Sequence, residues 1–354
     1  MKFQRVSAQE LSAYDKWLEN ADNGHLLQSS KWAEFKRGEW KPYCFFLKNG
    51  EDVVGAATVL VRSLPMVKKK VLYLSRGPVL VDYENRELWQ GFTAGIAQFA
   101  REIQGAVIKI DPAIPQASSC AQILQDLGYK SLKTQEGFGG GIQPAATIRV
   151  DLTLPLEEIH KRFPKKTRYG IRHAESNGVV FQREGVGGID EFYEAMQATA
   201  RRAKLVLRPL KYYRSVLDLF GNDATLINSY LDNQLISSGL YVKFGNKVWA
   251  LYGGITYKHS HIQVGHALEW EGMKWAKEKG AQWFDFFGIP VFRESESKRN
   301  KEIYGIYRFK RTFGGEELDF IGEYDLAVDS FAYGLWQVMN LGRKGILWLK
   351  KRFS

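Results

Sequence analysis

The sequence predicts an α/β (α+β) fold arranged in two domains. A chain of 354 residues, 45% of them hydrophobic and 14% aromatic, is long and apolar enough to bury more than one core. Helix and strand patterns alternate through the first half, and a strand at Ala146–Asp151 then opens a second round of the same pattern. Within that round, strand patterns at Asp223–Leu231, Gln234–Phe244 and Lys247–Tyr257 are joined by short turns, which predicts an antiparallel meander.

The first half opens with two helices. Ser7 and Glu10 have the spacing of a capping box ahead of an apolar repeat, which predicts a helix over residues 7–19. A short serine-capped helix then places Trp32 and Lys36 one turn apart, with Trp32 expected to pack inward. The other elements expected in this half are strands at Tyr43–Leu47, Val53–Val61, Lys70–Leu74 and Ala106–Asp111, a short strand after Arg76-Gly77-Pro78, helices at 85–103 and 117–128, and a closing loop at Gly137–Gly141.

A basic helix marks the second half. Cations crowd the stretch from Lys165 to Asn177, and the Asn177-Gly178 pair is a typical helix stop. Between Lys161 and Arg214, thirteen Lys or Arg face five Asp or Glu, so the basic excess is concentrated. The remaining elements expected here are a strand at Val179–Glu184, helices at 188–203 and 264–279, a buried strand at Trp283–Phe287, a mobile polar loop at 293–303 and a strand at Phe320–Asp325.

An aromatic and basic segment, Tyr304–Gly315, is the strongest candidate for a functional site. Cations set among rings are partly desolvated, so each attracts a phosphate or a developing oxyanion more strongly than in open water. The alternative is a solvated helix face whose rings cover a core. The segment's rings are Tyr304, Tyr307, Phe309 and Phe313, its cations are Arg308, Lys310 and Arg311, and Gly314-Gly315 follows them.

The end of the chain predicts a helix from about Ser330 to Phe353 that is rich in tryptophan, leucine and cations, with no acid after Asp329. Interfacial helices combine residues in this way, which favours contact with an anionic membrane surface. A terminal helix that packs on the first domain and carries a solvated basic tail fits the same pattern. The two readings can coexist.

Composition limits the compartment and the partners. The net charge of +11 and a pI near 9.4 point to polyanionic partners such as nucleic acid, anionic lipid or a phosphorylated substrate. Two cysteines, Cys44 and Cys120, are too few for a disulfide scaffold. No apolar signal core or run of eighteen apolar residues occurs, so we expect a soluble protein in the cytoplasm, with peripheral contact at the inner face of the membrane as an open alternative. We also expect it to be a monomer.

Other polar residues are weaker candidates for a catalytic or metal-binding role. His259, His261 and His266 cluster in the sequence, but they lack carboxylate support for a metal, so no metal or other cofactor is expected. Asp285 lies in an apolar strand, and we expect a structural hydrogen-bonding role for it. No serine or cysteine has a partnered base, so a covalent intermediate is not expected.

Several stretches resemble the FemABX family of transferases. Leu268–Ile289 and Gly305–Glu316 are similar to its signature region, Arg168–Val179 to its basic helix, and Arg76-Gly77-Pro78 with Lys109–Pro112 to its first domain. The resemblance covers most of the chain. Gly170 departs from the better helix former expected there, so we expect a kink or fraying of the basic helix.

The resemblance implies a fold of two tandem acetyltransferase-like (GNAT-like) domains with mixed, largely antiparallel sheets. Residues 1–145 and 322–354 would form the first, precursor-binding domain, and residues 146–321 the second. The implied activity transfers an amino acid from aminoacyl-tRNA to an amine on the stem peptide of a UDP-linked or lipid-linked peptidoglycan precursor, in interpeptide bridge synthesis. Residues 180–207 are too few and lack heptads for a coiled-coil arm, so the armless version is implied.

The resemblance also implies roles for single residues. Lys310, with Phe309 beside it, matches the catalytic lysine and would hold the ester or its oxyanion. Lys36 and Arg208 match positions that hold the precursor's diphosphate. Among the others, Trp32, Tyr212 and Tyr252 would line the same groove, Asp111 would contact the peptide or the amine, and Lys165, Lys166, Arg168 and Arg172 would bind tRNA. For Asp111, a strand-end acid that satisfies nearby backbone N–H groups is an equally open reading.

Two other functions fit parts of the sequence. A GNAT-like N-acyltransferase using acyl-CoA would favour a glycine-rich pyrophosphate turn, of which Gln263–Ala267 is only a faint echo. A non-catalytic protein could bind nucleic acid or membrane through its basic surface. In that case Lys310→Ala would weaken binding no more than the loss of any other surface cation.

Overall fold

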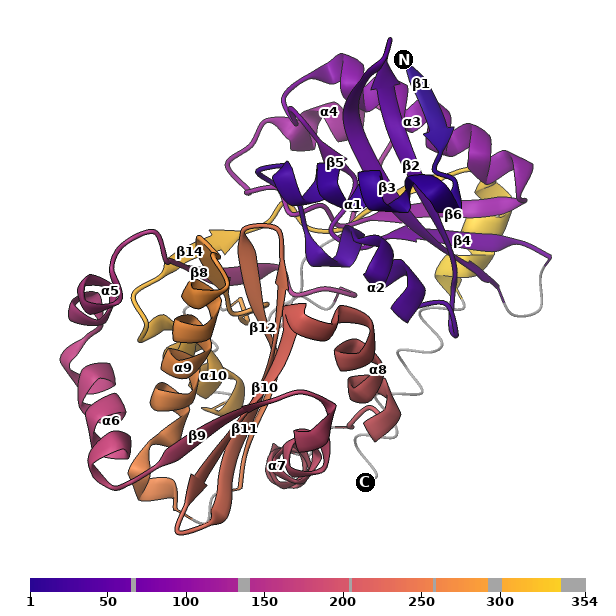
Figure 1. Cartoon of the computed structure of the whole chain (residues 1–354). Coiled ribbons are helices and arrows are strands. Elements are labelled where there is room, and N and C mark those ends of the chain that lie inside the picture. The colour runs from indigo at the N-terminus through magenta and orange to yellow at the C-terminus, as the bar shows by residue number, and fades with distance from the viewer. Residues whose placement is uncertain (65–67, 133–140, 204–205, 257–258, 292–300, 339–354) are drawn as a thin grey trace. The chain divides into compact units, whose positions relative to one another are not determined.

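The computed structural model describes residues 1–64, 68–132, 141–203, 206–256, 259–291 and 301–338 (Figure 1). The chain divides into two compact units, of which unit 1 comprises Met1–Lys133 and Phe320–Ser354, and unit 2 comprises Thr134–Asp319. Most of the expected glycine loop and polar loop, and the last part of the expected terminal helix, lie outside the described residues. No helix in the described ranges has the length and apolar character needed to cross a bilayer.

Unit 1 is built on a mixed sheet that has eight strands within the described residues, in the order β1-β2-β3-β4-β6-β15-β7 with β5 beside β3. Neighbouring strands are antiparallel except β4 and β6, which are parallel and are joined by helix α3. The strands are β1 (Lys2–Arg5), β2 (Lys41–Asn49), β3 (Asp52–Ser63), β4 (Lys70–Leu74), β5 (Val79–Leu80), β6 (Gly105–Ile110), β7 (Lys130–Ser131) and β15 (Tyr324–Ala327).

The two faces of this sheet bury different sets of side chains, as the period of two along a strand requires. On β2, Phe45 packs into the core that α3 and α4 cover, whereas Phe46 meets Tyr14 of α1. The helices of unit 1 are α1 (Leu11–Asn20), α2 (Ser30–Phe35), α3 (Arg86–Glu102) and α4 (Cys120–Asp126), and residues 330–338 are also helical.

Unit 2 repeats this plan with a sheet of seven strands in the described residues, in the order β14-β8-β13-β12-β11-β10-β9. Among the strand pairs of the described residues in this unit, β12 and β13 alone are parallel, and helix α9 connects them as α3 connects β4 and β6. These strands are β8 (Ala146–Asp151), β9 (Val180–Glu184), β10 (Ala224–Leu231), β11 (Gln234–Phe244), β12 (Lys247–Ile255), β13 (Trp283–Asp285) and β14 (Glu316–Asp319). The predicted mixed, largely antiparallel α/β fold and its second round are thus confirmed.

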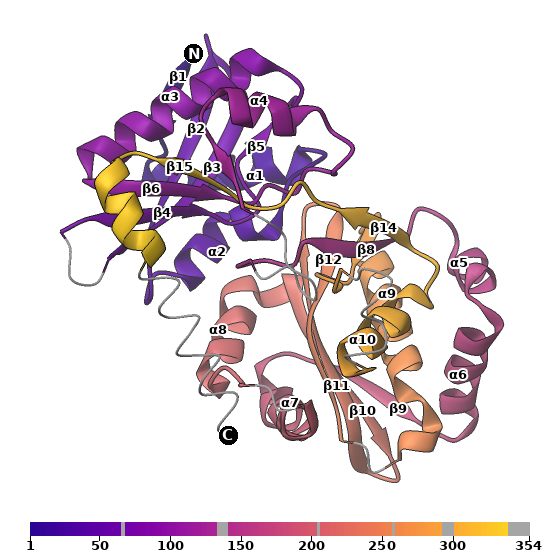
Figure 2. The ribbon, with the colours of Figure 1, turned by 180° about the vertical axis from the view of Figure 1, so that it is seen from behind.

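The helices of unit 2 cover both faces of its sheet. Helices α7 and α8 lie on one face, and α6, α9 and α10 lie on the other (Figures 1 and 2). Helix α10 follows the second strand of the parallel pair, β13, just as α4 follows β6 in unit 1. The helices are α5 (Leu156–Arg162), α6 (Lys165–Ser176), α7 (Ile189–Ala203), α8 (Leu210–Phe220), α9 (Val264–Glu278) and α10 (Lys301–Arg311).

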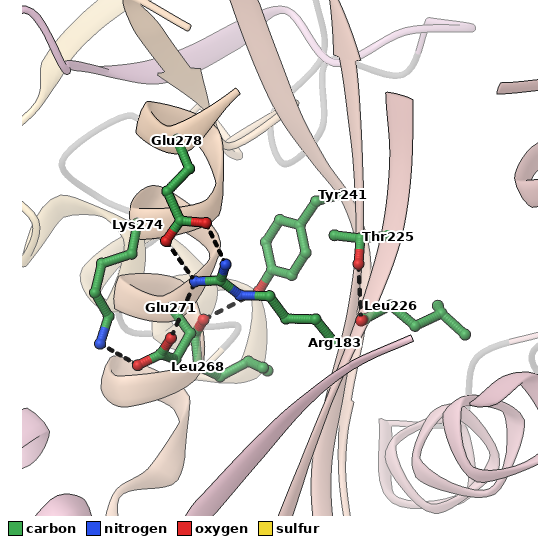
Figure 3. Close-up of polar contacts among 8 residues, drawn as sticks. All are labelled: Arg183, Thr225, Leu226, Tyr241, Leu268, Glu271, Lys274 and Glu278. Carbon is green, nitrogen blue, oxygen red and sulfur yellow. Dashed lines mark hydrogen bonds and ion pairs between the residues drawn. The ribbon is translucent and has the colours of Figure 1, made fainter. Parts of the chain in front are cut away.

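Polar contacts tie α9 to the sheet (Figure 3). The guanidinium group of Arg183, on β9, donates to both carboxylate oxygens of Glu278, with one bond of 3.0 Å. The same group lies 3.7 Å from the carboxylate of Glu271. The hydroxyl of Tyr241, on β11, donates to the carbonyl oxygen of Leu268 at 3.3 Å. Because α9 is held at several points along its length, it can serve as a fixed support for α6 and α10.

The structure corrects the expectations at several points. The strand expected at Phe320–Asp325 is wrong, because β14 ends at Asp319 in the sheet of unit 2 and β15 begins at Tyr324 in the sheet of unit 1. Helix α6 runs unbroken through Gly170, so the expected kink or fraying is also wrong. A Cβ atom on Gly170 would lie 3.0 Å from Nδ1 of His266, so glycine at this position allows α6 to pack closely on α9.

Candidate active site

The ammonium group of Lys310, on α10, is held by backbone oxygens of unit 2. Its Nζ atom donates hydrogen bonds to the carbonyl oxygens of Phe286 at 2.8 Å and Gly288 at 2.6 Å. We call these two oxygens the carbonyl cradle. An ammonium group has three N–H donors, so the cradle uses two of them and orients the third.

Asp285, at the end of β13, shapes the turn that carries the carbonyl cradle. Its buried carboxylate accepts hydrogen bonds from Thr147 Oγ1 at 2.6 Å, from Arg149 Nε at 3.0 Å and from the backbone N–H of Phe287 at 2.7 Å. Phe287 has a φ of 63°, a left-handed conformation that costs energy for a residue with a Cβ atom. The structural hydrogen-bonding role expected for Asp285 is therefore confirmed.

The ammonium group of Lys310 is poorly solvated. Desolvation lowers the pKa of Lys310, and the negative charges of Glu269 and Asp285 oppose that shift. Desolvation likewise raises the pKa of Glu269, on α9, and the positive charge of Lys310 opposes it. A cation in such surroundings interacts strongly with any negative charge that develops nearby.

Aromatic rings from several elements surround this site. The ring of Phe309 lies 5.2 Å from that of His266 and 5.5 Å from that of Phe313, measured between centroids. Phe313 is fully buried and also contacts the ring of Phe286, whose carbonyl belongs to the cradle. Phe309 and Phe313 thus fix the face of α10 that lies against the core of unit 2.

The other two cations of the segment lie differently. Arg308 and Arg311 are exposed, and Arg311 pairs with Glu317 on β14 at 3.1 Å. Arg308 and Arg311 do lie over the rings of Tyr304 and Tyr307, at 5.9 Å and 5.8 Å from the ring centroids, but because both are exposed the expected desolvation is wrong for these two. Along a helix, neighbouring side chains point in directions about 100° apart, so only Lys310 of the three turns towards the cradle.

Helix α6 presents the four cations proposed for tRNA. Lys165, Lys166 and Arg172 are exposed, and Arg168 is half-buried. The buried Nε atom of Arg168 has no hydrogen-bond partner among the described residues. These cations lie on the same helix that packs through Gly170 against α9, which supports Glu269 and the ring of Phe309.

Three residues expected to bind substrate come together at α8 and β12. Arg208 lies two residues before the start of α8, and its guanidinium carbon lies 5.3 Å from the ring centroid of Tyr212. The hydroxyls of Tyr212 and Tyr252 are 3.4 Å apart, and burial raises the pKa of Tyr252. One cation and two phenols therefore form a single cluster in unit 2, the Arg208 cluster.

The remaining expected substrate residues belong to unit 1. Trp32 is buried as predicted, and the ammonium group of Lys36 lies 5.1 Å from its ring centroid. Asp111 is buried and accepts hydrogen bonds from the hydroxyl of Tyr73 and the backbone N–H of Arg76, each at 2.6 Å. These contacts match the reading of Asp111 as a strand-end acid that satisfies local donors, and burial raises its pKa to about 6.

Of the three histidines that cluster in the sequence, His266 packs among aromatic rings, whereas His261 is exposed. The rings of His259 and His261 are 6.1 Å apart, and His266 packs between Phe309 and Phe313. In the part of the chain that the structure describes, no group of three or more His, Cys, Asp or Glu side chains is arranged to hold a metal ion.

Comparison with known proteins identifies the family. The FemAB family profile matches residues 9–234 and 225–340, which together span most of the chain. The chain belongs to the FemAB family. Among curated relatives of this FemAB-family protein, the lipid II:glycine glycyltransferase of Staphylococcus epidermidis is 24% identical over 390 residues, covering 91% of this chain and 92% of the relative.

Solved structures agree with the two-unit fold of the FemAB-family chain. A crystal structure of FemX has a TM-score of 0.86 and 24% sequence identity, covering 95% of this chain and 99% of that one. A tandem GNAT protein from the clavulanic acid biosynthesis pathway has a TM-score of 0.53 and 12% identity, covering 92% and 98%. The expected family and the tandem GNAT-like fold are both confirmed.

Sequence reasoning missed two parts of the candidate site. Glu269 was not singled out, although it lies inside the stretch that carries the family resemblance. The carbonyl cradle was also missed, because backbone oxygens leave no residue-type signal. Gly288 offers a partial signal, since a Cβ atom there would lie 2.4 Å from Cγ of Pro144.

Proposed function

We propose that this protein is an aminoacyltransferase that moves an amino acid from aminoacyl-tRNA to an amine on the stem peptide of a lipid-linked peptidoglycan precursor. The observation that carries the proposal is the desolvated ammonium group of Lys310 in its carbonyl cradle. Membership of the FemAB family supports the reaction class, and the named lipid II:glycine relatives support the acceptor.

The proposed chemistry needs positioning and charge stabilisation more than a nucleophile. The acceptor amine attacks the carbonyl carbon of the aminoacyl ester, and a negative charge develops on the carbonyl oxygen. The intermediate then collapses, the amide bond forms, the ester C–O bond breaks, and the proton released by the amine passes to the ribose hydroxyl. The third N–H of Lys310 stabilises the oxyanion while the cradle holds the other two.

We assign roles to the other candidate residues from the chemistry of their side chains. The Arg208 cluster and Lys36 are proposed to hold the precursor's diphosphate, since an arginine fork binds two phosphate oxygens at once. Trp32 and Asp111 are proposed to support the acceptor side. The four cations of α6 are proposed to bind the RNA backbone, because cation contacts to phosphates supply most of the sequence-independent affinity.

Contact with the inner membrane surface is part of this proposal. Within the helix at 330–338, Ala332 and Tyr333 are buried, whereas Phe331, Leu335 and Val338 are 79%, 38% and 67% exposed. The sequence from residue 339 to residue 354 adds five cations and no acid. An exposed apolar helix face that is followed in the sequence by a run of cations suits an anionic bilayer, where a lipid-linked acceptor would lie.

An in vitro transfer assay tests the proposed function. The protein is incubated with a mixture of charged tRNAs and with either the lipid-linked or the UDP-linked precursor, and the precursor is analysed by mass spectrometry. We expect the mass of one amino acid to be added to the lipid-linked form, with no addition after ribonuclease treatment. No addition to either precursor contradicts the proposal, and addition that depends on acyl-CoA favours the N-acyltransferase alternative.

A further inference from the structure

A buried side-chain amide takes the place of a strand in the sheet of unit 1. Strand β3 pairs with β5 near its start and with β4 from Leu60 onwards, so residues 57–59 face no strand on that side within the described residues. The side chain of Gln28, which is fully buried, makes contact there instead. Gln28 ends a short turn of helix, Leu26–Gln28, that lies between α1 and α2 in the chain.

The amide group of Gln28 makes the hydrogen bonds that a neighbouring strand would make. Its oxygen Oε1 accepts from the backbone N–H of Thr58 at 2.8 Å, and its nitrogen Nε2 donates to the carbonyl oxygens of Ser75 at 2.7 Å and Thr58 at 3.4 Å. A side-chain amide carries the same kinds of donor and acceptor as a peptide unit, so it can replace one. Gln28 therefore joins β3 to the turn that follows β4.

The turn that Gln28 holds carries the backbone donor of Asp111. Arg76, which follows Ser75, has a φ of 57°, a left-handed conformation that costs energy for a residue with a Cβ atom. Its backbone N–H donates to Oδ1 of Asp111 at 2.6 Å. Gly77 lets the turn approach the amide closely, because a Cβ atom on it would lie 2.4 Å from Oε1 of Gln28. The amide of Gln28 thus fixes the donor that orients the Asp111 carboxylate.

The backbone of Gln28 also fixes the start of α2. Its carbonyl oxygen accepts a hydrogen bond from Oγ1 of Thr58 at 2.6 Å. The next residue, Ser29, is the N-cap of α2, and its Oγ atom accepts from the backbone N–H of Trp32 at 3.1 Å. Helix α2 carries Trp32, and Lys36 directly follows its last residue. One buried residue therefore ties the Asp111 turn to the helix that presents two other residues assigned to the precursor.

We propose that Gln28 is a positioning residue for the acceptor substrate. Its amide sets the Asp111 carboxylate in register with Trp32 and Lys36, so that all three meet the precursor in one fixed arrangement. This inference rests on the proposed function, in which these residues serve the precursor. Without the amide, the turn after β4 loses its tie to β3 and the carboxylate loses its fixed donor. Binding of the precursor should weaken, whereas the cations of α6 assigned to tRNA lie in unit 2 and should be unaffected.

Transfer kinetics and thermal unfolding of matched variants test this role. Gln28→Met removes the amide and keeps a side chain of similar length. We expect it to raise the KM for the precursor about tenfold, as for a lost hydrogen bond to a charged group, and to change the KM for aminoacyl-tRNA less than about twofold. Leu124→Ala is the matched control, because it removes a fully buried side chain of α4, on the face of the sheet opposite α1. It should lower the melting temperature and leave both KM values within about twofold of wild type.

The titration of Asp111 gives a readout that a general loss of stability would not move. Its carboxyl carbon is followed by NMR in protein labelled with carbon-13 at aspartate, and the signal is assigned with Asp111→Asn. Burial raises the pKa of Asp111 to about 6, and the charge and the backbone N–H of Arg76 oppose that shift. Without a fixed N–H donor, the pKa should rise further in Gln28→Met and stay at the wild-type value in Leu124→Ala.

The possible outcomes separate the role of Gln28 from the proposed function. A precursor KM or an Asp111 pKa that keeps its wild-type value in Gln28→Met overturns the positioning role, and so do equal rises in the two KM values. If the wild-type protein transfers nothing, the proposed function fails, and the Asp111 titration still decides whether Gln28 positions that carboxylate. Should Gln28→Met not fold, Gln28→Asn is measured in the same way, because its amide is one methylene too short to reach both β3 and the turn.

Discussion

Replacement of Lys310 by methionine removes the ammonium group and keeps most of the apolar stem. The loss of one preorganised oxyanion donor is expected to slow the chemical step about 100- to 1,000-fold, or roughly 3–4 kcal/mol. The fold should suffer much less. The hydrogen bonds to the two carbonyls of the cradle are lost, but the cation no longer has to be desolvated, and its lowered pKa shows that desolvation outweighs the attraction of nearby carboxylates. We expect a loss of stability of about 1–2 kcal/mol.

The assay for this variant is single-turnover transfer from preloaded aminoacyl-tRNA with enzyme in excess, beside thermal unfolding of the same samples. Lys279→Met is the matched control, because it removes an exposed lysine of the same unit and should leave transfer unchanged. Lys310→Arg keeps the charge with a different donor geometry and should retain partial activity. Transfer within about threefold of wild type by a folded Lys310→Met protein would refute the assigned role, since a lost oxyanion donor costs far more.

Three further predictions follow from the same contacts. Asp285→Asn replaces the carboxylate that pairs with Arg149 by an uncharged amide and should lower the free energy of unfolding by about 2–3 kcal/mol. The rate of amino acid transfer should fall more than the affinity for tRNA. Equal falls in rate and affinity would contradict a positioning role for Asp285. Gly170→Ala should destabilise the protein by about 1–3 kcal/mol, because its Cβ atom crowds α9. Gly305→Ala is the matched control in the same chemical denaturation series: its Cβ atom would meet no described atom within 4 Å, so the substitution should stabilise the protein by about 0.5–1 kcal/mol. The pKa of Lys310 is lowered, so the ammonium group should lose its proton well below the ordinary lysine pKa of about 10.4. The rate of transfer should therefore begin to decline below that pH. A rate that stays constant up to the ordinary lysine pKa would contradict the role assigned to Lys310.

The lowered pKa of Lys310 also has a consequence for stability. Between its folded-state pKa and its ordinary value, the unfolded chain holds the proton and the folded chain does not. The contribution of this group to the free energy of unfolding therefore rises with pH across that window. Asp111 acts in the opposite direction, because its pKa is raised to about 6, so its contribution is greatest at acid pH and is lost as pH rises through that value.

Most regular elements could be predicted because each carries its own local signal. Strand β11 has the bounds that the sequence predicts, Gln234–Phe244, and α9 lies within one residue of its predicted range. β1 was missed, since four residues with charged ends show too little alternation to register as an edge strand. β14 and β15 were merged into one prediction, because the chain leaves one sheet and enters another within five residues and no local pattern marks the change.

The candidate site was predictable only in part. Lys310 was found through its aromatic neighbours and the family resemblance, but its surroundings depend on contacts between residues far apart in the sequence. In the sequence, Glu269 looks like an ordinary polar position of α9. In the structure its carboxylate accepts a hydrogen bond from the hydroxyl of Tyr241, which lies on β11. The difference between Lys310 and its exposed neighbours Arg308 and Arg311 depends on which side of α10 meets the core, which only the packing of unit 2 decides.

The role of Lys310 is tested most directly by comparing two adenosine-linked analogues of the reacting ester, one planar and uncharged and one a tetrahedral phosphonate anion. The wild-type protein should bind the phosphonate at least about 100-fold more tightly than the planar analogue, and Lys310→Met should lose nearly all of that preference while keeping its affinity for the planar one. If the substitution weakens both analogues equally, the lysine only helps to bind substrate, and the proposed oxyanion stabilisation is wrong.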